Sequence, residues 1–141
     1  MAENELPESI VICEVGTRDG LQNEKGTVSA DDKAALIDAM GKAGFKVIEV
    51  GSFVSPRAVP QMANTDEVFA RIHKIPGVEY RALIANLRGV DRAIACGCKK
   101  VKLNVSASTA HNLANLNCTP EQSVNRFAAC VARAKEAGIG I

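Results

Sequence analysis

The sequence alternates short apolar runs with helical patterns four times, and this alternation constrains the fold more than any other feature. The apolar runs cover residues 10–15, 45–50, 80–85 and 101–105, and after each run comes a polar stretch and then apolar residues at helical spacing. Uninterrupted apolar runs rich in β-branched residues are typical of strands covered on both faces in a parallel sheet. Four such units in succession predict an α/β protein, either an open doubly wound sheet or a closed barrel.

Local signals predict where several helices begin and end. Ser29 precedes two acids and can accept from the free amides of a first turn, whereas Gly44 can close that helix in the left-handed conformation. Thr119, Pro120 and Gln122 predict the start of the last helix, because they combine a capping box with proline at the first helical position. The buried face of that last helix is expected at Val124, Phe127, Val131 and Ala134.

The end of the chain continues the same pattern. Residues 106–118 are predicted to form a long polar loop that carries His111, and residues 138–141 look like the beginning of a fifth strand. A complete (β/α)8 barrel needs about 250 residues, so a chain of 141 residues would supply about half of one. Four strands alone would leave two open edges and one exposed apolar sheet face.

Composition and charge restrict the partners that we expect. The chain is 47% hydrophobic and 23% charged, which is typical of one globular domain. Its net charge is +1 without a basic block, so nucleic acid is not expected as a partner. There is no signal-peptide pattern and no apolar run approaching about 18 residues, so no membrane is expected. A small-molecule ligand is expected instead of these partners. Five cysteines without disulfide spacing, including the close Cys96 and Cys98, indicate free thiols in a reducing cytoplasm.

Polar side chains follow the predicted strands at their carboxyl ends, where the loops of either α/β architecture converge on one crevice. The first strand leads to Arg18 and Asp19, and the second leads to Glu49 and Ser52. The later strands lead to Asn86, Asn104, Ser106 and Ser108.

Glu49 is the most informative of these residues, because a carboxylate among apolar neighbours is costly without a cation or hydrogen-bond donors. One interpretation is a structural ion pair with Arg18 across neighbouring strands. The other is that Asp19 and Glu49 face a metal or a polar substrate, while Arg18 supplies positive charge to a developing oxyanion. Glu14, which also lies in an apolar run, is an alternative partner for the arginine.

Two motifs at a characteristic separation, EVGTRDGLQNEKG and VIEVGSFVSPRAVPQMANTDEV, resemble the N-terminal half of the 3-hydroxy-3-methylglutaryl-CoA lyase family. The similarity continues through LIANLRGVDRAIACG and SAS-x-x-HN-x-x-N-x-N-C-T. It implies a (β/α)8 TIM barrel, of which residues 1–141 form the N-terminal part of a single domain, about its first four βα units. The shorter RDG pattern would also admit isopropylmalate or homocitrate synthases, but VGSFVSPRAVPQM favours a lyase.

The resemblance also implies a role for each site residue. Asp19 would be a ligand of Mg²⁺ or Mn²⁺, Arg18 would stabilise the enolate oxygen, and Glu49 would lie beside the metal site and position Arg18. Gln22 and Ser52 would contact the acyl portion of the substrate. The coenzyme A moiety would lie near Asn23, Lys25, Asn115 and Thr119.

The implied reaction is metal-assisted retro-aldol (Claisen-type) cleavage of 3-hydroxy-3-methylglutaryl-CoA, or a close analogue, to acetyl-CoA and acetoacetate. The family's His-x-His metal pair, its later asparagine ligand and its loop cysteine are absent from these residues, so we expect little or no activity from this chain alone. Ala58, Asn104 and Thr109 differ from residues found in relatives and leave the exact acyl group open. The alternatives are a condensing synthase and a non-catalytic half-barrel that assembles with a second copy or another chain through its open sheet edges.

Overall fold

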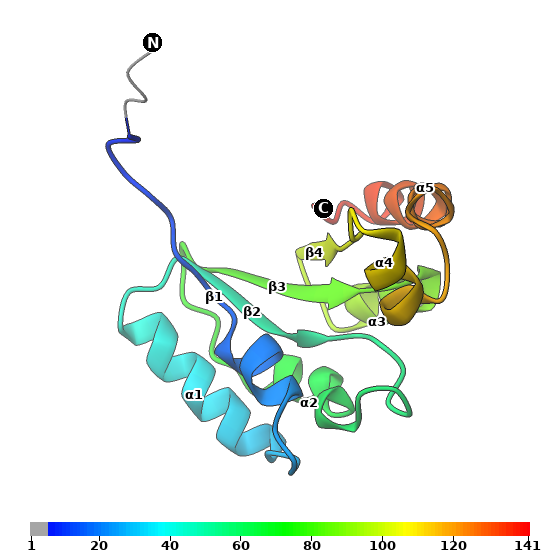
Figure 1. Ribbon diagram of the computed structural model, residues 1–141. Coiled ribbons are helices and arrows are strands. Elements are labelled where there is room, and N and C mark those ends of the chain that lie inside the picture. Colours follow the sequence, from blue (N-terminus) through cyan, green and yellow to red (C-terminus); the bar gives the residue numbers. More distant parts are fainter. Residues whose placement is uncertain (1–5) are drawn as a thin grey trace.

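A computed structural model describes residues 6–141, so the first five residues of the predicted domain lie outside the described residues. Its four strands form one sheet in which every neighbouring pair is parallel (Figure 1). The strands are β1 (Cys13–Glu14), β2 (Val47–Ser52), β3 (Glu79–Ile84) and β4 (Lys100–Leu103), and they lie side by side in sequence order.

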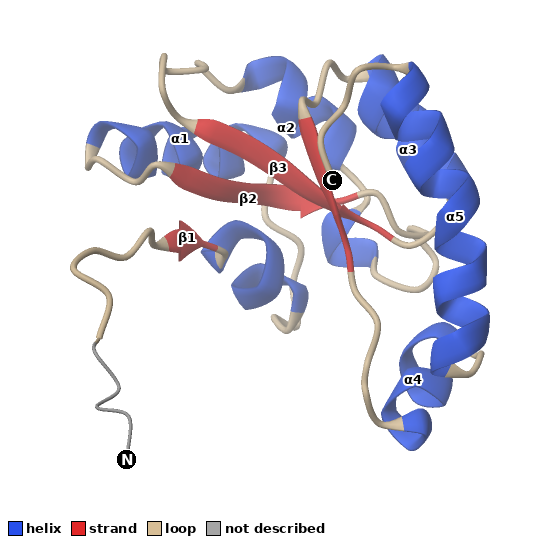
Figure 2. Cartoon of the chain, turned by 90° about the horizontal axis from the view of Figure 1, so that it is seen from above, coloured by secondary structure: helices blue, strands red, loops and turns tan. Residues whose placement is uncertain are grey.

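The main helices follow one another around one side of the sheet, as Figure 2 shows. They are α1 (Ala30–Lys42), α2 (Thr65–Arg71), α3 (Leu87–Ala95) and α5 (Pro120–Glu136); the remaining helices are η1 (Gly16–Gly20), η2 (Pro60–Met62) and α4 (Thr109–Leu116). Parallel crossovers in strict sequence order all turn the same way and place their helices on one face. A doubly wound sheet would reverse its strand order and carry helices on both faces. The architecture is therefore that of part of a barrel.

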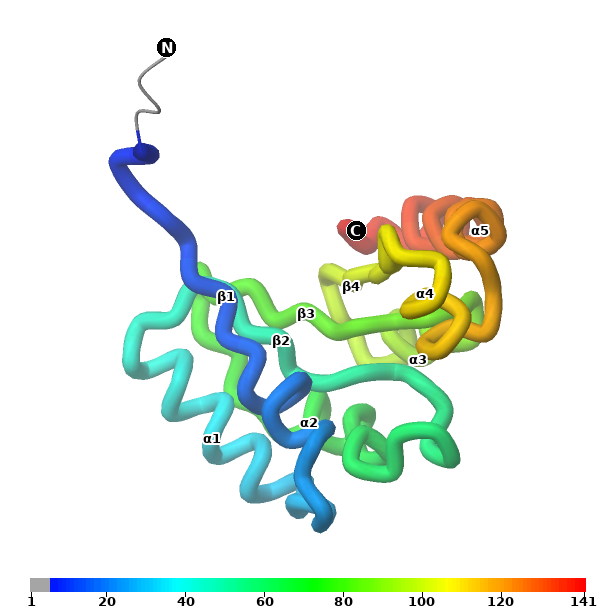
Figure 3. The backbone as a smooth tube through the Cα atoms, in the orientation of Figure 1, coloured from blue at the N-terminus to red at the C-terminus, as the bar shows by residue number. Residues whose placement is uncertain are grey.

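One apolar core fills the space between this sheet and its helices. All six residues of β2 are buried, whereas β3 alternates between buried and half-buried residues. Side chains from each of the four main helices reach the core, among them Ile37, Val68, Val90 and Ala134. In the view of Figure 3, α1 and α2 lie below β1 and β2. Polar side chains of β2 and β4 also meet, since Lys102 Nζ lies 2.8 Å from Glu49 Oε2.

The predicted helix boundaries are confirmed. Ser29 Oγ accepts from the amide of Asp32 at 3.1 Å, and Gly44 has a φ of 101°. Thr119 and Gln122 form the predicted capping box, in which each side chain accepts from the other residue's amide. At the end of the chain, Gly140 forms a parallel bridge with Lys100, in agreement with the predicted beginning of a further strand.

The first predicted strand, residues 10–15, is wrong over its first half. Only Cys13–Glu14 pairs as β1, and Ile10, Val11 and Ile12 are 76%, 72% and 59% exposed. β1 has a neighbour on one side only, which is β2. An apolar run needs cover on both faces to be buried, and the described residues provide none for Ile10–Ile12.

Two predictions for the C-terminal region are also wrong. The expected loop at residues 106–118 contains α4, which places His111 on a helix. Ser108 caps this helix, and the buried Asn112 holds its surroundings together with bonds to the amide of Ser106 and the carbonyl of Cys118. A short helix built around a buried asparagine lacks the apolar periodicity from which a helix is predicted.

The predicted buried face of α5 is confirmed at Ala134 but is wrong at its other three residues. Ser123, Cys130 and Ala134 are buried, but Val124 is 57% exposed, and Phe127 and Val131 are only half-buried. The contacts of α5 are with α3 and α4, and small side chains on the contacting face allow such helices to approach closely. The larger apolar residues consequently line an open surface.

Gly51 is required for packing between β2 and α2. A Cβ atom there would lie 2.7 Å from Thr65 Oγ1 and 2.9 Å from Thr65 Cγ2, and the buried Thr65 hydroxyl is held by the carbonyl of Met62 at 2.8 Å. We expect Gly51→Ala to lower the free energy of unfolding by about 1–3 kcal/mol, measured by urea denaturation. Gly26→Ala is the control, because its Cβ would meet nothing within 4 Å; equal losses in the two variants would contradict the packing argument.

Candidate active site

The polar residues after β1 lie on a wide turn of π-helix, η1. The Val15 carbonyl accepts from three successive amides, those of Arg18 at 3.1 Å, Asp19 at 2.7 Å and Gly20 at 3.4 Å. Turns of this kind occur frequently at functional sites. This winding buries the Arg18 side chain to 10% exposure and leaves that of Asp19 56% exposed.

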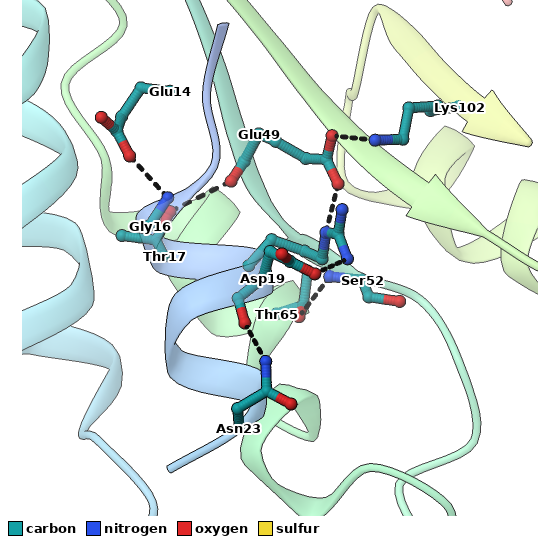
Figure 4. Close-up of polar contacts among 10 residues, drawn as sticks. Glu14, Gly16, Thr17, Asp19, Asn23, Glu49, Ser52, Thr65 and Lys102 are labelled. Atoms are coloured by element: carbon teal, nitrogen blue, oxygen red, sulfur yellow. Dashed lines mark hydrogen bonds and ion pairs between the residues drawn. The ribbon is translucent and has the colours of Figure 1, made fainter. Parts of the chain in front are cut away.

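Glu49, on β2 (Figure 4), forms a buried ion pair with Arg18, which lies on η1. Arg18 Nε donates to Glu49 Oε1, and the Glu49 side chain has no exposed surface. Thr17 Oγ1 also donates to the Glu49 carbonyl at 3.0 Å, which fixes the two strand ends together. The predicted pairing with Glu49 is confirmed, and the alternative with Glu14 is wrong because Glu14 Oε1 accepts instead from the Gly16 amide at 2.5 Å.

Lys102 is a second cation at Glu49, and the sequence analysis missed it. Its Nζ lies 2.8 Å from Glu49 Oε2, an ionic contact whose geometry is not that of a hydrogen bond, since Oε2 has no hydrogen-bond partner. A signal was available: Lys102 follows Val101, which is buried in the core, and side chains alternate along a strand. The buried carboxylate is therefore held between two cations, which offsets the cost of its desolvation.

Asp19 is the one site carboxylate that is open to a ligand. Its Oδ1 accepts from Arg18 Nη1 at 2.7 Å, and its backbone carbonyl accepts from Asn23 Nδ2 at 2.7 Å. Residues 6–141 contain no group of three or more His, Cys, Asp or Glu side chains placed to hold a metal ion. Within residues 6–141, Asp19 is therefore suited to supply one hard carboxylate ligand to a divalent metal.

Ser52 has a buried hydroxyl without a partner. The residue is fully buried at the end of β2, and its Oγ makes no hydrogen bond. Buried polar atoms in folded proteins are nearly always paired, so an unpaired one beside a site is a candidate ligand contact. Gln22 lies half-buried just after η1.

The predicted coenzyme A contacts fall into two separate groups. Asn23 and Lys25 are exposed on the loop between η1 and α1. Asn115 lies on α4, where its Nδ2 is 2.8 Å from His111 Nε2, and Thr119 caps α5. The described contacts bring Arg18, Asp19 and Glu49 together but join neither Asn115 nor Thr119 to them.

Two other strand-end residues act as helix caps. Asn86 Oδ1 accepts from the Gly89 amide at 3.0 Å at the start of α3, and Ser108 caps α4.

Cys96 and Cys98 are packing residues: Cys98 is 2% exposed. Burial raises the pKa of the Cys96 thiol to about 11, and the nearby carboxylate of Asp66 adds to the rise. A protonated thiol is a poor metal ligand.

The family model described as HMGL-like matches residues 9–141. The chain belongs to the HMGL-like family. Among HMGL-like relatives, the mitochondrial hydroxymethylglutaryl-CoA lyase of Macaca fascicularis is 48% identical over 136 residues, which are 96% of this chain and 42% of that protein.

Solved structures agree with this membership. The hydroxymethylglutaryl-CoA lyase from Pseudomonas aeruginosa matches with a TM-score of 0.91 at 46% identity, over 95% of this chain and 45% of that chain. An HMG-CoA lyase from Acinetobacter baumannii, in complex with coenzyme A and 3-methylmalate, matches with a TM-score of 0.87 at 40% identity, over 92% of this chain and 43% of that chain. The HMGL-like chain thus corresponds to the N-terminal part of the lyase TIM barrel and spans less than half the length of these relatives.

Proposed function

We propose that this chain supplies one half of the active site of an acyl-CoA carbon–carbon lyase. The observation that carries the proposal is the group at the ends of β1 and β2, where the exposed Asp19 adjoins Arg18 and the buried Glu49 holds that arginine. Relatives with this fold and family membership are named hydroxymethylglutaryl-CoA lyases. The proposed substrate is 3-hydroxy-3-methylglutaryl-CoA or a close analogue.

Arg18 is proposed to stabilise the charge that the reaction develops. Once the tertiary hydroxyl has lost its proton to a base, cleavage of the bond between the acyl α-carbon and the carbinol carbon gives a ketone and a thioester enolate, whose oxygen becomes negative. Arg18 uses Nε for Glu49 and Nη1 for Asp19, so its Nη2 is free of bonds to the described residues and can donate to that oxygen. Because Glu49 fixes the guanidinium before substrate arrives, little reorganisation is needed during the reaction.

Asp19 is proposed to hold a divalent ion, Mg²⁺ or Mn²⁺. An exposed carboxylate is the hard oxygen ligand that these ions prefer. When bound, the ion would supply Lewis-acid polarisation of substrate oxygens. The unpaired hydroxyl of Ser52, together with Gln22, is proposed to bind the acyl portion.

The loop after η1 is proposed to bind the coenzyme A portion. Lys25 carries an exposed ammonium that suits a phosphate, and Asn23 adds a neutral donor on the same loop. Asn115 and Thr119 are proposed to contact the same portion from α4 and α5. A relative of 40% identity was solved with coenzyme A, which supports this ligand class.

The proposal is tested in a barrel chimera, in which these 141 residues replace the matching segment of the Pseudomonas aeruginosa lyase. The chimera is expected to convert 3-hydroxy-3-methylglutaryl-CoA to acetyl-CoA and acetoacetate in the presence of Mg²⁺, as followed by mass spectrometry. Condensation of acetyl-CoA with a 2-oxo acid, without cleavage, would favour the synthase alternative. A folded chimera that performs neither reaction would indicate a non-catalytic half-barrel.

Replacing Asp19 with asparagine should weaken the use of metal. The amide keeps the size of the side chain but loses its charge, so in the barrel chimera we expect the Mg²⁺ concentration for half-maximal activity to rise at least about tenfold. Asp91→Asn is a matched control, because its side chain is 54% exposed and also pairs with an arginine, Arg133, at 2.9 Å. An unchanged Mg²⁺ requirement in Asp19→Asn would remove Asp19 from the metal site.

Assembly through the open sheet edge is a further part of the proposal. The exposed residues 10–12 and residues 43–46 line a hollow of about 330 Å³ beside β1, and exposed apolar edge strands tend to pair with other chains. Light scattering of the 141-residue chain should show a defined dimer; a monodisperse monomer would argue against such assembly.

We also propose a cytoplasmic location. No helix among residues 6–141 is long and apolar enough to cross a membrane, and the cytoplasmic 3-hydroxy-3-methylglutaryl-CoA lyase of Rattus norvegicus is 44% identical over 136 residues. Mitochondrial relatives are 44% and 48% identical, so fractionation of the native cells is the deciding measurement.

A further inference from the structure

Lys33, on the first turn of α1, is a buried lysine that pairs with no carboxylate. The residue is 2% exposed, and its Nζ donates to the Gln61 carbonyl at 2.5 Å and to Asn64 Oδ1 at 2.8 Å. Both acceptors are neutral oxygens, and burial lowers the pKa of the ammonium from its usual value. Lysines are almost never buried in this way, because the desolvation is costly.

The two acceptors of Lys33 are themselves tied to the loop that follows η1. Gln61 Nε2 donates to the Glu24 carbonyl at 2.7 Å, and Asn64 Nδ2 donates to the Val28 carbonyl at 3.0 Å. Lys33 thus stands at the centre of a network that reaches both ends of the segment 24–28. Lys25 lies within that segment.

We propose that Lys33 is a positioning residue, which acts through Gln61 and Asn64 to hold the loop 24–28, and with it Lys25, in the conformation that receives the phosphate groups of an acyl-CoA. The inference rests on the proposed function, because it assigns Lys25 to the coenzyme A portion. Lys33 itself is buried beneath the loop and does not touch the ligand.

The loop needs such support because it has little structure of its own. Residues 23–27 are exposed and belong to no helix or strand. A loop that is ordered before binding saves the conformational entropy that a mobile loop loses when it binds. The acyl end is held elsewhere, by Arg18 and Ser52 at the strand ends, so losing the support should affect the binding of the nucleotide portion and leave the chemical step unchanged.

The test uses Lys33→Met in the barrel chimera with two substrates. Methionine keeps an unbranched apolar chain but removes every donor, so Gln61 and Asn64 lose the group that anchors them. We expect the KM for 3-hydroxy-3-methylglutaryl-CoA to rise about tenfold and kcat to stay within about twofold. The KM for the same acyl group on pantetheine, which lacks the nucleotide portion, should change by less than about twofold.

Four variants accompany this one. Lys42→Met removes an exposed lysine from the last turn of the same helix and should leave both KM values unchanged. Lys25→Met should reproduce the pattern of Lys33→Met, and the double variant should be no worse than Lys25→Met alone, because Lys33 acts through Lys25. Gln61→Ala removes only the link to Glu24 from a partly exposed site and should raise the KM for the acyl-CoA alone, even if Lys33→Met fails to fold.

Several outcomes would overturn the inference. An equal rise of KM for both substrates, a large fall in kcat, or additive effects of Lys33→Met and Lys25→Met would each show that Lys33 serves the fold in general. If the wild-type chimera is inactive, the proposed function fails, and hydrogen exchange then decides the positioning role. Faster exchange confined to residues 24–28 in Gln61→Ala would support the network, whereas unchanged exchange there would refute it.

Discussion

Replacing Arg18 with methionine in the barrel chimera should lower kcat about a thousandfold, because removal of a donor aimed at a developing oxyanion typically costs two to three orders of magnitude. The KM should change little, since the interaction is strongest after the carbon–carbon bond begins to break. The fold should survive, because Glu49 keeps its contact with Lys102 at 2.8 Å. Steady-state kinetics with saturating Mg²⁺ provide the measurement.

Two further variants make the Arg18 result specific. Arg126→Met removes an exposed arginine from α5 and should leave kcat unchanged. Arg18→Lys keeps the charge but lacks the planar fork that reaches Glu49 and Asp19 together, so we expect only partial recovery. If kcat for Arg18→Met stays within about tenfold of the unsubstituted chimera, Arg18 does not stabilise the enolate.

Replacing Glu49 with glutamine should give the largest loss of stability, about 3 kcal/mol or more in the free energy of unfolding. The amide matches the carboxylate in size, but it leaves Arg18 and Lys102 as two cations without their shared anion. The Glu49 side chain has no exposed surface and that of Arg18 is 10% exposed, so water can compensate only near Lys102, which is 31% exposed. Urea unfolding of the variant and of the parent chain measures the loss.

Glu79 offers a matched control for this effect. It lies on β3 and also faces two cations, Arg81 and Lys100, but its side chain is 33% exposed. Exposed ion pairs contribute little, so Glu79→Gln should cost less than about 1 kcal/mol. Adding Lys102→Met to Glu49→Gln should recover part of the loss, because it removes one of the unpaired charges. Equal losses for Glu49→Gln and Glu79→Gln would show that burial does not set the cost.

The parts of the site that could be predicted from the sequence are those governed by a single strong physical requirement. Glu49 stands in an apolar run and needs a cation, and parallel strands bring their carboxyl ends together, so its pairing with Arg18 could be expected. The capping box at Thr119 and Gln122 is local in sequence and equally predictable. In both cases the information lies in a few neighbouring residues and in the geometry of one element.

The parts that could not be predicted depend on contacts between distant segments. In the sequence, Lys33 looks like an ordinary lysine on a helix. Its burial depends on its contacts with residues 61–64, which the sequence does not predict. Lys102 reaches Glu49 across an intervening strand, so its role depends on the curvature of the sheet. Asn112 stabilises α4 from within a polar segment that has no helical periodicity. Residues 10–12 do not form the predicted buried strand, because burial depends on neighbouring segments that an apolar run in the sequence does not identify.

The strand ends of β1 and β2 are proposed to form a working half of an acyl-CoA lyase site. The most direct test is the kcat of the barrel chimera for 3-hydroxy-3-methylglutaryl-CoA, measured beside the parental Pseudomonas aeruginosa lyase under the same conditions. We predict a kcat within about tenfold of the parental value, since the two segments share their fold, with a TM-score of 0.91 at 46% identity. A chimera with the same urea midpoint of unfolding as the parental lyase, but with a kcat more than about a thousandfold lower, would contradict this proposal.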